Sequence, residues 1–218
     1  MKFPYHKTSA CIFDLDGTLL DSMGLWQDID KEYLARFNIP FDDQISEDIK
    51  SMTFNESADY FLERFELPKT KEEIMDDWNE MAEEAYRDTI PTKPGVHAFL
   101  ADLEAHNIKM CIATSCTKEH ALLALDRLGI LKYFDFLLTC KDVGKNKEFP
   151  DVFLACAKKL DVPIEKTMVF EDLLVALQVA KKEGFQTCAV EDILTVHQNK
   201  EVKAVADIFI RDFTEFER

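Results

Sequence analysis

The chain has 218 residues, a formal charge of −16 and a hydrophobic fraction of 47%. This length supports one sizeable core, alone or with a small accessory domain. The acidic balance argues against nucleic acid or an anionic membrane surface as a partner, because the chain has no basic excess with which to bind phosphates and release counterions.

The first predicted element is a strand over about Thr8 to Leu15, and it carries an acidic pair at its end. The apolar residues Ala10 to Phe13 precede Asp14 and Asp16, and Gly17 then permits a sharp turn. Alternate residues of a strand share a face, so both aspartates point to the same side. Crowded carboxylates are costly to desolvate unless a cation lies beside them. The pair therefore predicts a hard divalent metal, Mg²⁺ first of all, with one carboxylate as nucleophile and the other as acid/base.

From about Asp21 to Thr89 the pattern is helical, without a convincing strand. Apolar residues recur at helical spacing in three sets, which are Trp26, Ile29, Tyr33 and Phe37, then Phe54, Ala58, Phe61, Leu62 and Phe65, and then Ile74, Trp78, Met81, Ala82 and Ala85. Each set makes one apolar stripe, so three or four helices can bury their stripes against one another. We expect residues 21–89 to form a small all-α domain.

Prolines and a glycine punctuate residues 90–95, and beyond them strands alternate with helices. The expected strands are Lys109–Thr114, Phe136–Thr139, Thr167–Phe170, Thr187–Val190 and a short edge at Ile208–Ile210. The expected helices are Lys118–Leu128, Asp151–Leu160 and Asp172–Lys182. This alternation predicts an α/β fold, with a parallel sheet covered by helices on both faces and built from residues 1–20 and 90–218.

Three polar residues fall at the predicted carboxyl ends of strands, or one residue beyond them. They are Asp14, Thr114 and Asp172. Ligands of parallel sheets bind at these ends, so we expect the three side chains to converge. Each also has a simpler interpretation: Thr114 could only cap its strand end, and Asp172 is expected to cap the helix that follows it as well.

Four motifs in this order resemble those of the haloacid dehalogenase-like hydrolase superfamily. The run from Asp14 to Ser22 resembles the first motif closely, and Ile112–Ser115 resembles the second. Lys147–Asp151 resembles the third, although Glu148 stands where proline is usual, and Val169–Asp172 resembles the fourth. The resemblance covers almost the whole chain. It implies a Rossmann-like core, and a helical insert at residues 21–89 similar to the cap domain of the β-phosphoglucomutase and phosphoglycolate phosphatase subfamily.

The resemblance implies a Mg²⁺-dependent phosphatase that works through a phosphoaspartate. Asp14 would be the nucleophile, and Asp16 would protonate the leaving alcohol and later deprotonate water. Mg²⁺ would bind Asp14, the backbone carbonyl of Asp16, and Asp172. Glu171 would brace the site or replace one of these ligands.

The resemblance also implies the groups that hold the phosphate. Thr114 and Ser115 would donate to phosphoryl oxygens. Lys147 would balance the nucleophile's charge and contact the same phosphoryl group, with Lys145 as the competing candidate two residues earlier. In the helical insert, Trp26 and Phe54 lie where substrate contacts of the family cluster, and a packing role is at least as plausible for both.

Two other functions stay open. A phosphomutase of the β-phosphoglucomutase type would use the same Asp14 chemistry, but such enzymes carry a histidine and an arginine in the insert, where this chain has Leu25-Trp26 and residues 51–54 read Ser-Met-Thr-Phe. This difference favours hydrolysis. The third possibility, a non-catalytic sensor or scaffold with the same fold, is disfavoured because costly charged residues are kept at every motif.

Cysteine usage and the first residues bear on location. The six cysteines include no CxxC pair and most lie in apolar runs, so we expect them to be reduced. No apolar run approaches a membrane span, and the first seven residues lack the apolar region of a signal peptide. We therefore expect a cytoplasmic, monomeric enzyme that acts on a small-molecule phosphate ester, with neither a nucleic acid nor a membrane as partner.

Overall fold

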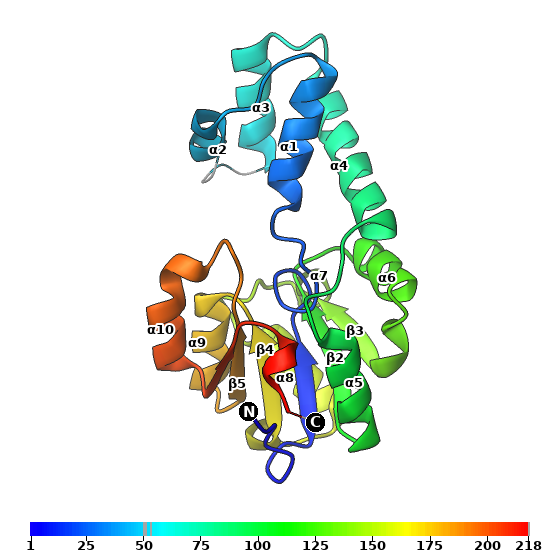
Figure 1. Cartoon of the computed structure of the whole chain (residues 1–218), viewed down its shortest axis with the longest axis vertical. Coiled ribbons are helices and arrows are strands. Elements are labelled where there is room, and N and C mark those ends of the chain that lie inside the picture. The colour runs from blue at the N-terminus through cyan, green and yellow to red at the C-terminus, as the bar shows by residue number, and fades with distance from the viewer. Residues whose placement is uncertain (50–51, 53, 218) are drawn as a thin grey trace. The chain divides into compact units, whose positions relative to one another are not determined.

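A computed structural model of the chain describes residues 1–49, 52 and 54–217 (Figure 1). The chain divides into two compact units. The sheet unit consists of Met1–Met23 and Ile90–Arg218, and the helical unit consists of Gly24–Thr89.

Six parallel strands form the sheet, in the order β3-β2-β1-β4-β5-β6. They are β1 (Ala10–Phe13), β2 (Lys109–Thr114), β3 (Phe136–Thr139), β4 (Thr167–Glu171), β5 (Gln186–Val190) and β6 (Ile208–Ile210). The predicted parallel α/β fold is confirmed, and the first strand is shorter than expected. The strand order reverses between β1 and β4, which is the point where doubly wound sheets bind their ligands.

Six α-helices accompany the described strands. They are α5 (Val96–Ala105), α6 (Lys118–Arg127), α7 (Cys140–Val143), α8 (Asp151–Leu160), α9 (Leu174–Lys182) and α10 (Asn199–Val205). Figure 1 shows α5 and α9 flanking the sheet from opposite sides. The core has two parts because side chains alternate along each strand.

The two faces of the sheet bury different side chains. On one face, Ala10 and Ile12 of β1 pack in a cluster with Val152 and Phe153 of α8 and with small residues of α9. On the other, Phe13 stacks on Phe170 of β4 with 4.5 Å between ring centroids. Further aromatic rings extend this second face, from Phe3, Phe99 of α5, Phe213 and Phe216. Both faces of β1 are therefore dry, as the apolar run before Asp14 predicts.

The helical unit contains α1 (Leu25–Arg36), α2 (Asp43–Ile49), α3 (Phe54–Phe65) and α4 (Lys71–Asp88), and no strand among its described residues. Trp78 of α4 lies in its core, with its ring 4.9 Å from that of Phe61 and 5.8 Å from that of Tyr33. At the start of α4, the Thr70 hydroxyl accepts the Glu73 N–H, and the Glu73 carboxylate accepts the Thr70 N–H. The apolar stripes predicted for residues 21–89 thus meet in one core.

Two expectations about the whole chain can be compared with the structure. All six cysteines are described, and none of them forms a disulfide. Among the described residues, no helix is both long enough and apolar enough to cross a membrane.

Candidate active site

A buried lysine joins two carboxylates at the carboxyl ends of β1 and β4. Lys147 donates from Nζ to Asp14 Oδ1, and to Glu171 Oε1 at 2.5 Å. The three side chains come from segments far apart in the sequence and all are buried, with Asp14 only 6% exposed. The register explains the meeting: Phe13 pairs with Phe170, so Asp14 and Glu171 follow at the same level of the sheet. Lys147 thus holds the predicted nucleophile where the strand order reverses.

Glu171 has both carboxylate oxygens engaged. While Oε1 accepts from Lys147, Oε2 accepts the backbone N–H groups of Asp172 and Leu173, each at 3.0 Å. These bonds fix the chain where it leaves β4. They favour a bracing role for Glu171, one of the two roles that the sequence left open.

The expected helix start at Asp172 is wrong. The helix α9 begins at Leu174 with Leu173 as its N-cap residue, and no side chain caps it. Glu171 already binds the N–H groups of the two residues before the helix, which holds them outside the helical conformation. The Asp172 side chain therefore does not cap α9 and points elsewhere.

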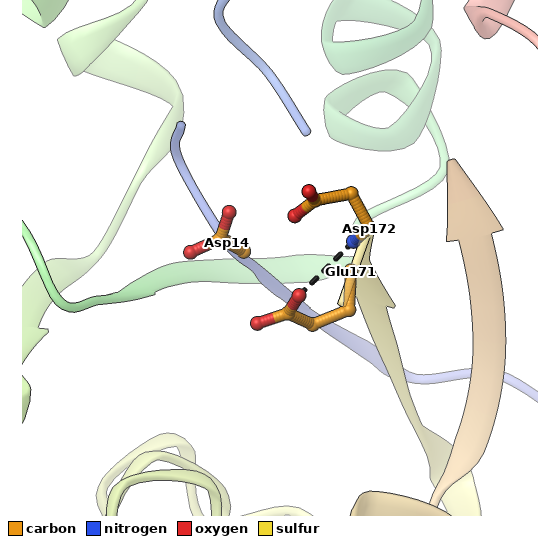
Figure 2. A group of neighbouring side chains, drawn as sticks. All are labelled: Asp14, Glu171 and Asp172. Carbon is orange, nitrogen blue, oxygen red and sulfur yellow. Dashed lines mark hydrogen bonds between the residues drawn. The ribbon is translucent and has the colours of Figure 1, made fainter. Parts of the chain in front are cut away.

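Three buried carboxyl groups gather here, from Asp14, Glu171 and Asp172. Each offers an oxygen within 4.8 Å of the others, and Figure 2 shows the groups around the ends of β1 and β4. Asp172 Oδ2 is buried and has no hydrogen-bond partner within the described part of the chain. A buried acceptor without a partner is rare and costly. A hard divalent cation at Asp172 Oδ2 would supply the missing partner, so the donor set fits Mg²⁺.

The electrostatics of this cluster point the same way. Burial raises the pKa of the Asp14 carboxyl to about 7, Lys147 opposes the rise, and Glu171 adds to it. Burial and the neighbouring carboxylates of Glu171 and Asp14 raise the pKa of Asp172 well above its ordinary value. For Lys147, burial lowers the pKa, but the two carboxylates raise it more. One lysine does not balance three acids in a dry site, and a divalent cation would.

Gly17 leaves room for the Asp172 carboxyl group. Its φ of +84° is disfavoured for residues with a side chain, and a Cβ there would lie 2.7 Å from Asp172 Oδ2. The glycine that follows the acidic pair is therefore required both by the turn and by the carboxylate next to it.

Asp16 is held separately from the three-carboxyl cluster. The hydroxyl of Ser22 donates to Asp16 Oδ1 at 2.6 Å, and among the described residues the cluster does not include the Asp16 side chain. From the sequence, Ser22 was expected only at the end of the first motif and near a hinge of the helical insert, and its bond to Asp16 was not predicted. The bond orients Asp16, as an acid/base group requires.

Thr114 and Ser115 follow β2 directly. The Thr114 hydroxyl is buried and accepts the N–H of Cys116 at 3.0 Å. A hydroxyl that accepts one bond still has its own proton to donate, which suits a phosphoryl oxygen. Ser115 is exposed, with its hydroxyl 3.4 Å from the sulfur of Cys140.

The two candidate lysines, Lys147 and Lys145, differ in burial and in their contacts. Lys147 contacts Asp14, whereas Lys145 is exposed and its Nζ lies 4.8 Å from the ring centroid of Phe149. Motif spacing in the sequence favoured Lys147 and left Lys145 as the competing candidate, because both lie in the loop before α8.

In the helical unit, Trp26 and Phe54 are neighbours. Their ring centroids lie 5.5 Å apart, Trp26 is 47% exposed, and Phe54 also contacts Trp78. The arrangement agrees with a packing role for Phe54, and a substrate role for both rings stays a prediction. Residues 51 and 53, which belong to the comparison with phosphomutases, lie outside the described residues.

A second buried ion pair was missed in the sequence. Lys93 Nζ donates to Asp192 Oδ2 at 2.9 Å and to the Glu191 carbonyl at 2.6 Å. Asp192 lies just beyond the end of β5, so an acid after a predicted strand was the available signal. The backbone N–H of Lys93 also binds the Leu19 carbonyl at 2.8 Å. The pair therefore ties the loop that follows Asp14 to the end of β5.

Comparisons with known proteins extend these observations. A sequence model described as haloacid dehalogenase-like hydrolase matches residues 11–190. The chain is 30% identical to (DL)-glycerol-3-phosphatase 2 of Arabidopsis thaliana, over 94% of this chain and 87% of that protein. It is 28% identical to the phosphorylated carbohydrates phosphatase of Thermotoga maritima, over 81% of this chain and 82% of that protein.

The fold has close relatives among solved structures. A candidate β-phosphoglucomutase from Thermotoga maritima matches with a TM-score of 0.82 and 25% identity, covering 93% of this chain and 94% of that chain. The matched stretches include residues of both units.

Proposed function

Because the chain belongs to the haloacid dehalogenase-like hydrolases, as its four motifs predicted, we propose that it is a Mg²⁺-dependent phosphatase of small-molecule phosphate monoesters. One observation carries the proposal: Asp14 is held by Lys147 beside Asp172, whose buried Oδ2 lacks a partner within the described residues. Relatives that are named as phosphatases of small phosphorylated compounds support the reaction class.

The proposed reaction has two steps. A carboxylate oxygen of Asp14 attacks phosphorus, the bond from phosphorus to the ester oxygen breaks, and Asp16 gives its proton to the departing alkoxide. Water then attacks the phosphorus of the phosphoaspartate, Asp16 takes a proton from this water, and the bond from phosphorus to Asp14 breaks. Inorganic phosphate and the unmodified Asp14 result.

The other residues would hold charges and atoms in place. Lys147 would orient Asp14 and contact the phosphoryl group, and Thr114 would donate to a phosphoryl oxygen. Asp14, Asp172 and the backbone carbonyl of Asp16 would hold Mg²⁺, with Glu171 as a brace. When bound, Mg²⁺ would offset the negative charge of the carboxylates and of the phosphoryl oxygens.

We further propose that residues 21–89 act as a cap domain. Such a lid would exclude water during the first step, and phosphate esters need it because their uncatalysed hydrolysis is among the slowest of biological reactions. In this proposal, Trp26 and Phe54 contribute to substrate selection. We also place the protein in the cytoplasm, for which its six free thiols are suited, and expect it to be a monomer.

The experiment that tests the function is a substrate screen. Purified full-length protein with Mg²⁺ is incubated with sugar phosphates, nucleoside monophosphates, phosphoglycolate and phosphorylated amino alcohols, and inorganic phosphate is measured. Hydrolysis of at least one class above the background of Asp14→Asn is expected. No release from any ester would contradict the proposal and favour a non-catalytic role.

A phosphomutase is the second candidate, favoured by the likeness to a candidate β-phosphoglucomutase. It would pass the phosphoryl group of Asp14 to a sugar hydroxyl. Leu25 and Trp26 argue against a phosphomutase, because they stand where the mutases of the family carry a histidine. Incubation of β-glucose 1-phosphate with a bisphosphate primer separates the two: isomerisation with little phosphate release would establish the mutase.

A further inference from the structure

Lys93 and Asp192 form a buried ion pair whose presence stability alone does not explain. Lys93 is 6% exposed and Asp192 is 2% exposed, and Lys93 Nζ lies 2.9 Å from Asp192 Oδ2. Replacing a buried ion pair by apolar side chains of similar volume is often neutral or stabilising, because the desolvation of both charges offsets their attraction. Neither residue belongs to the cluster of Asp14, Glu171 and Asp172. The pair therefore calls for a role besides stability.

The acceptors of the Lys93 ammonium group are firmly held. Lys93 Nζ also donates to the Glu191 carbonyl at 2.6 Å, and the Glu191 N–H donates to the Ile210 carbonyl of β6 at 2.8 Å. Asp192 Oδ1 accepts the Leu194 N–H at 3.0 Å, which fixes the carboxyl group. A lysine bound to two fixed acceptors has little freedom of movement, so its side chain can anchor the segment that carries it to the end of β5.

The segment that carries Lys93 pairs with the loop after Asp14. Residues 91–93 run antiparallel to residues 19–21. Their backbones share two hydrogen bonds, one from the Lys93 N–H to the Leu19 carbonyl at 2.8 Å and one of 3.0 Å that the Asp21 N–H donates. Lys93 therefore holds the loop through its backbone and the end of β5 through its side chain.

The same loop reaches the carboxyl groups that fit a metal. Asp16 forms a bridge with Leu20, and the Gly17 N–H donates to the Leu20 carbonyl at 3.0 Å. Thr18 is fully buried, and its hydroxyl lies 3.5 Å from Asp172 Oδ1. The other oxygen of this carboxyl group is the one without a partner among the described residues. The position of the loop therefore bears on both the Asp16 carbonyl and the Asp172 carboxyl group.

We propose that the Lys93–Asp192 pair positions the loop of residues 16–20 for the divalent cation, so that breaking the pair weakens metal binding. The inference rests on the proposed function, in which the Asp16 carbonyl and the Asp172 carboxylate hold Mg²⁺. Lys93 and Asp192 act as positioning residues and take no part in phosphoryl transfer. Groups that orient metal ligands without binding the metal are typically worth roughly 10- to 100-fold in metal affinity.

The test removes both charges of the pair together. In Lys93→Met/Asp192→Asn the sum of the two charges stays zero, so a change in metal binding reports on position. Mn²⁺ serves as the probe, because it prefers the same oxygen ligands as Mg²⁺. Its dissociation constant is measured without substrate, from the electron paramagnetic resonance signal of the free ion. We expect the double variant to bind Mn²⁺ at least about tenfold more weakly than the wild-type protein.

Lys181 and Asp207 supply the matched control. They form a partly exposed ion pair of the sheet unit. Asp207 directly precedes β6, so it lies at the opposite end of the parallel sheet from Asp14. Lys181→Met/Asp207→Asn makes the same two side-chain changes there, and we expect it to keep the wild-type dissociation constant for Mn²⁺.

The single variant Lys93→Met separates position from charge by sign. It leaves Asp192 with its negative charge, which by itself would tighten the binding of a cation, whereas a displaced loop would weaken it. Weaker Mn²⁺ binding in Lys93→Met and in the double variant supports the proposal. Unchanged or tighter binding in the double variant would overturn it.

Folding is checked by circular dichroism and urea unfolding. A role in stability alone would lower the free energy of unfolding and leave the Mn²⁺ dissociation constant of the folded variants unchanged, which would also overturn the proposal. If Lys93→Met/Asp192→Asn does not fold, Lys93→Met/Asp192→Leu takes its place with the same criteria.

This inference and the phosphatase function can fail separately, because metal binding is measured without turnover. If the protein binds Mn²⁺ but hydrolyses no ester, the phosphatase function fails and the ratio of dissociation constants still decides the inference. If esters are hydrolysed and the ratio is about one, the inference alone fails. A wild-type protein that binds no Mn²⁺ would overturn the metal site and the inference together.

Discussion

The sheet unit and the helical unit bury charge in different ways. The sheet unit pairs its described buried lysines with acids: Lys147 with Asp14 and Glu171, and Lys93 with Asp192. The helical unit buries Asp30, and no lysine or arginine among the described residues forms an ion pair with it. A buried charge is tolerated when a partner balances it.

The comparison distinguishes two kinds of buried acid. Asp172 stands with two other carboxylates and one lysine, which suits a small hard cation. Asp30 is buried in the helical unit, and burial alone raises the pKa of its carboxyl group to about 7. Single substitutions of the buried charged residues in each unit test this difference.

The largest effect is expected from Asp14→Asn. The amide cannot form the phosphoaspartate, so phosphate release should fall by more than about 10³-fold, as for other catalytic nucleophiles. Initial rates with the best ester of the screen measure it, with circular dichroism as the check of folding. Wild-type-like rates would remove Asp14 from the chemistry.

Metal removal should have the next largest effect. Excess chelator should lower the rate at least about 100-fold, because the carboxylates at Asp14 and Asp172 would then lack their counter-charge. Adding Mg²⁺ back should restore the rate, and Asp172→Asn should need a higher Mg²⁺ concentration for half of its maximal rate. Full activity in chelator would exclude a metal-dependent site.

Breaking the matched pair Lys93–Asp192 should destabilise the sheet unit. In Lys93→Met, Asp192 stays buried without its partner, and we expect a loss of about 3–5 kcal/mol in the free energy of unfolding. Removing both charges in Lys93→Met/Asp192→Leu should recover most of that loss. Urea unfolding measures both variants, and equal losses for the single and the double variant would contradict the role of charge matching.

Neutralising Asp30, which has no described partner, should raise the free energy of unfolding, whereas Lys93→Met should lower it. Burial raises the pKa of Asp30 to about 7, whereas an unfolded aspartate titrates near 3.9. Between these values the folded chain holds a proton that the unfolded chain has released, so this group's contribution to stability falls as the pH rises from about 4 to 7. Asp30→Asn removes the ionisable carboxyl group, so the variant should be more stable than the wild type at pH 8 by up to about 4 kcal/mol.

The pH series supplies the control for that prediction. The advantage of Asp30→Asn over the wild type should shrink as the pH falls and should vanish near pH 4, while the exposed Asp28→Asn should show none at either pH. Urea unfolding at both pH values measures it. A destabilised Asp30→Asn at pH 8 would mean that Asp30 already has a favourable partner.

Much of the fold could be predicted because local signals were strong. The expected bounds of Lys109–Thr114, Phe136–Thr139 and Asp151–Leu160 agree with β2, β3 and α8, where apolar runs end at turn residues or proline. The start of α9 could not be predicted, because it depends on the Glu171 carboxylate, which accepts the backbone N–H groups of Asp172 and Leu173.

The candidate site was predictable in type more than in detail. The acidic pair and the strand ends indicated the acids, but the choice between Lys145 and Lys147 depends on the path of a loop in three dimensions. Asp30 was missed for a similar reason. A single acid within an amphipathic helix is typical of a solvated face, and its burial follows only from the packing of α1 in the helical unit.

The most direct test of the central claim is the location of the phosphoryl group during turnover. The protein is mixed with its best ester and Mg²⁺, quenched in acid within the first turnover, digested and analysed by mass spectrometry. The account predicts one phosphoryl group on Asp14, and none in Asp14→Asn. A phosphoryl group on another residue, or the same modification in Asp14→Asn, would contradict it.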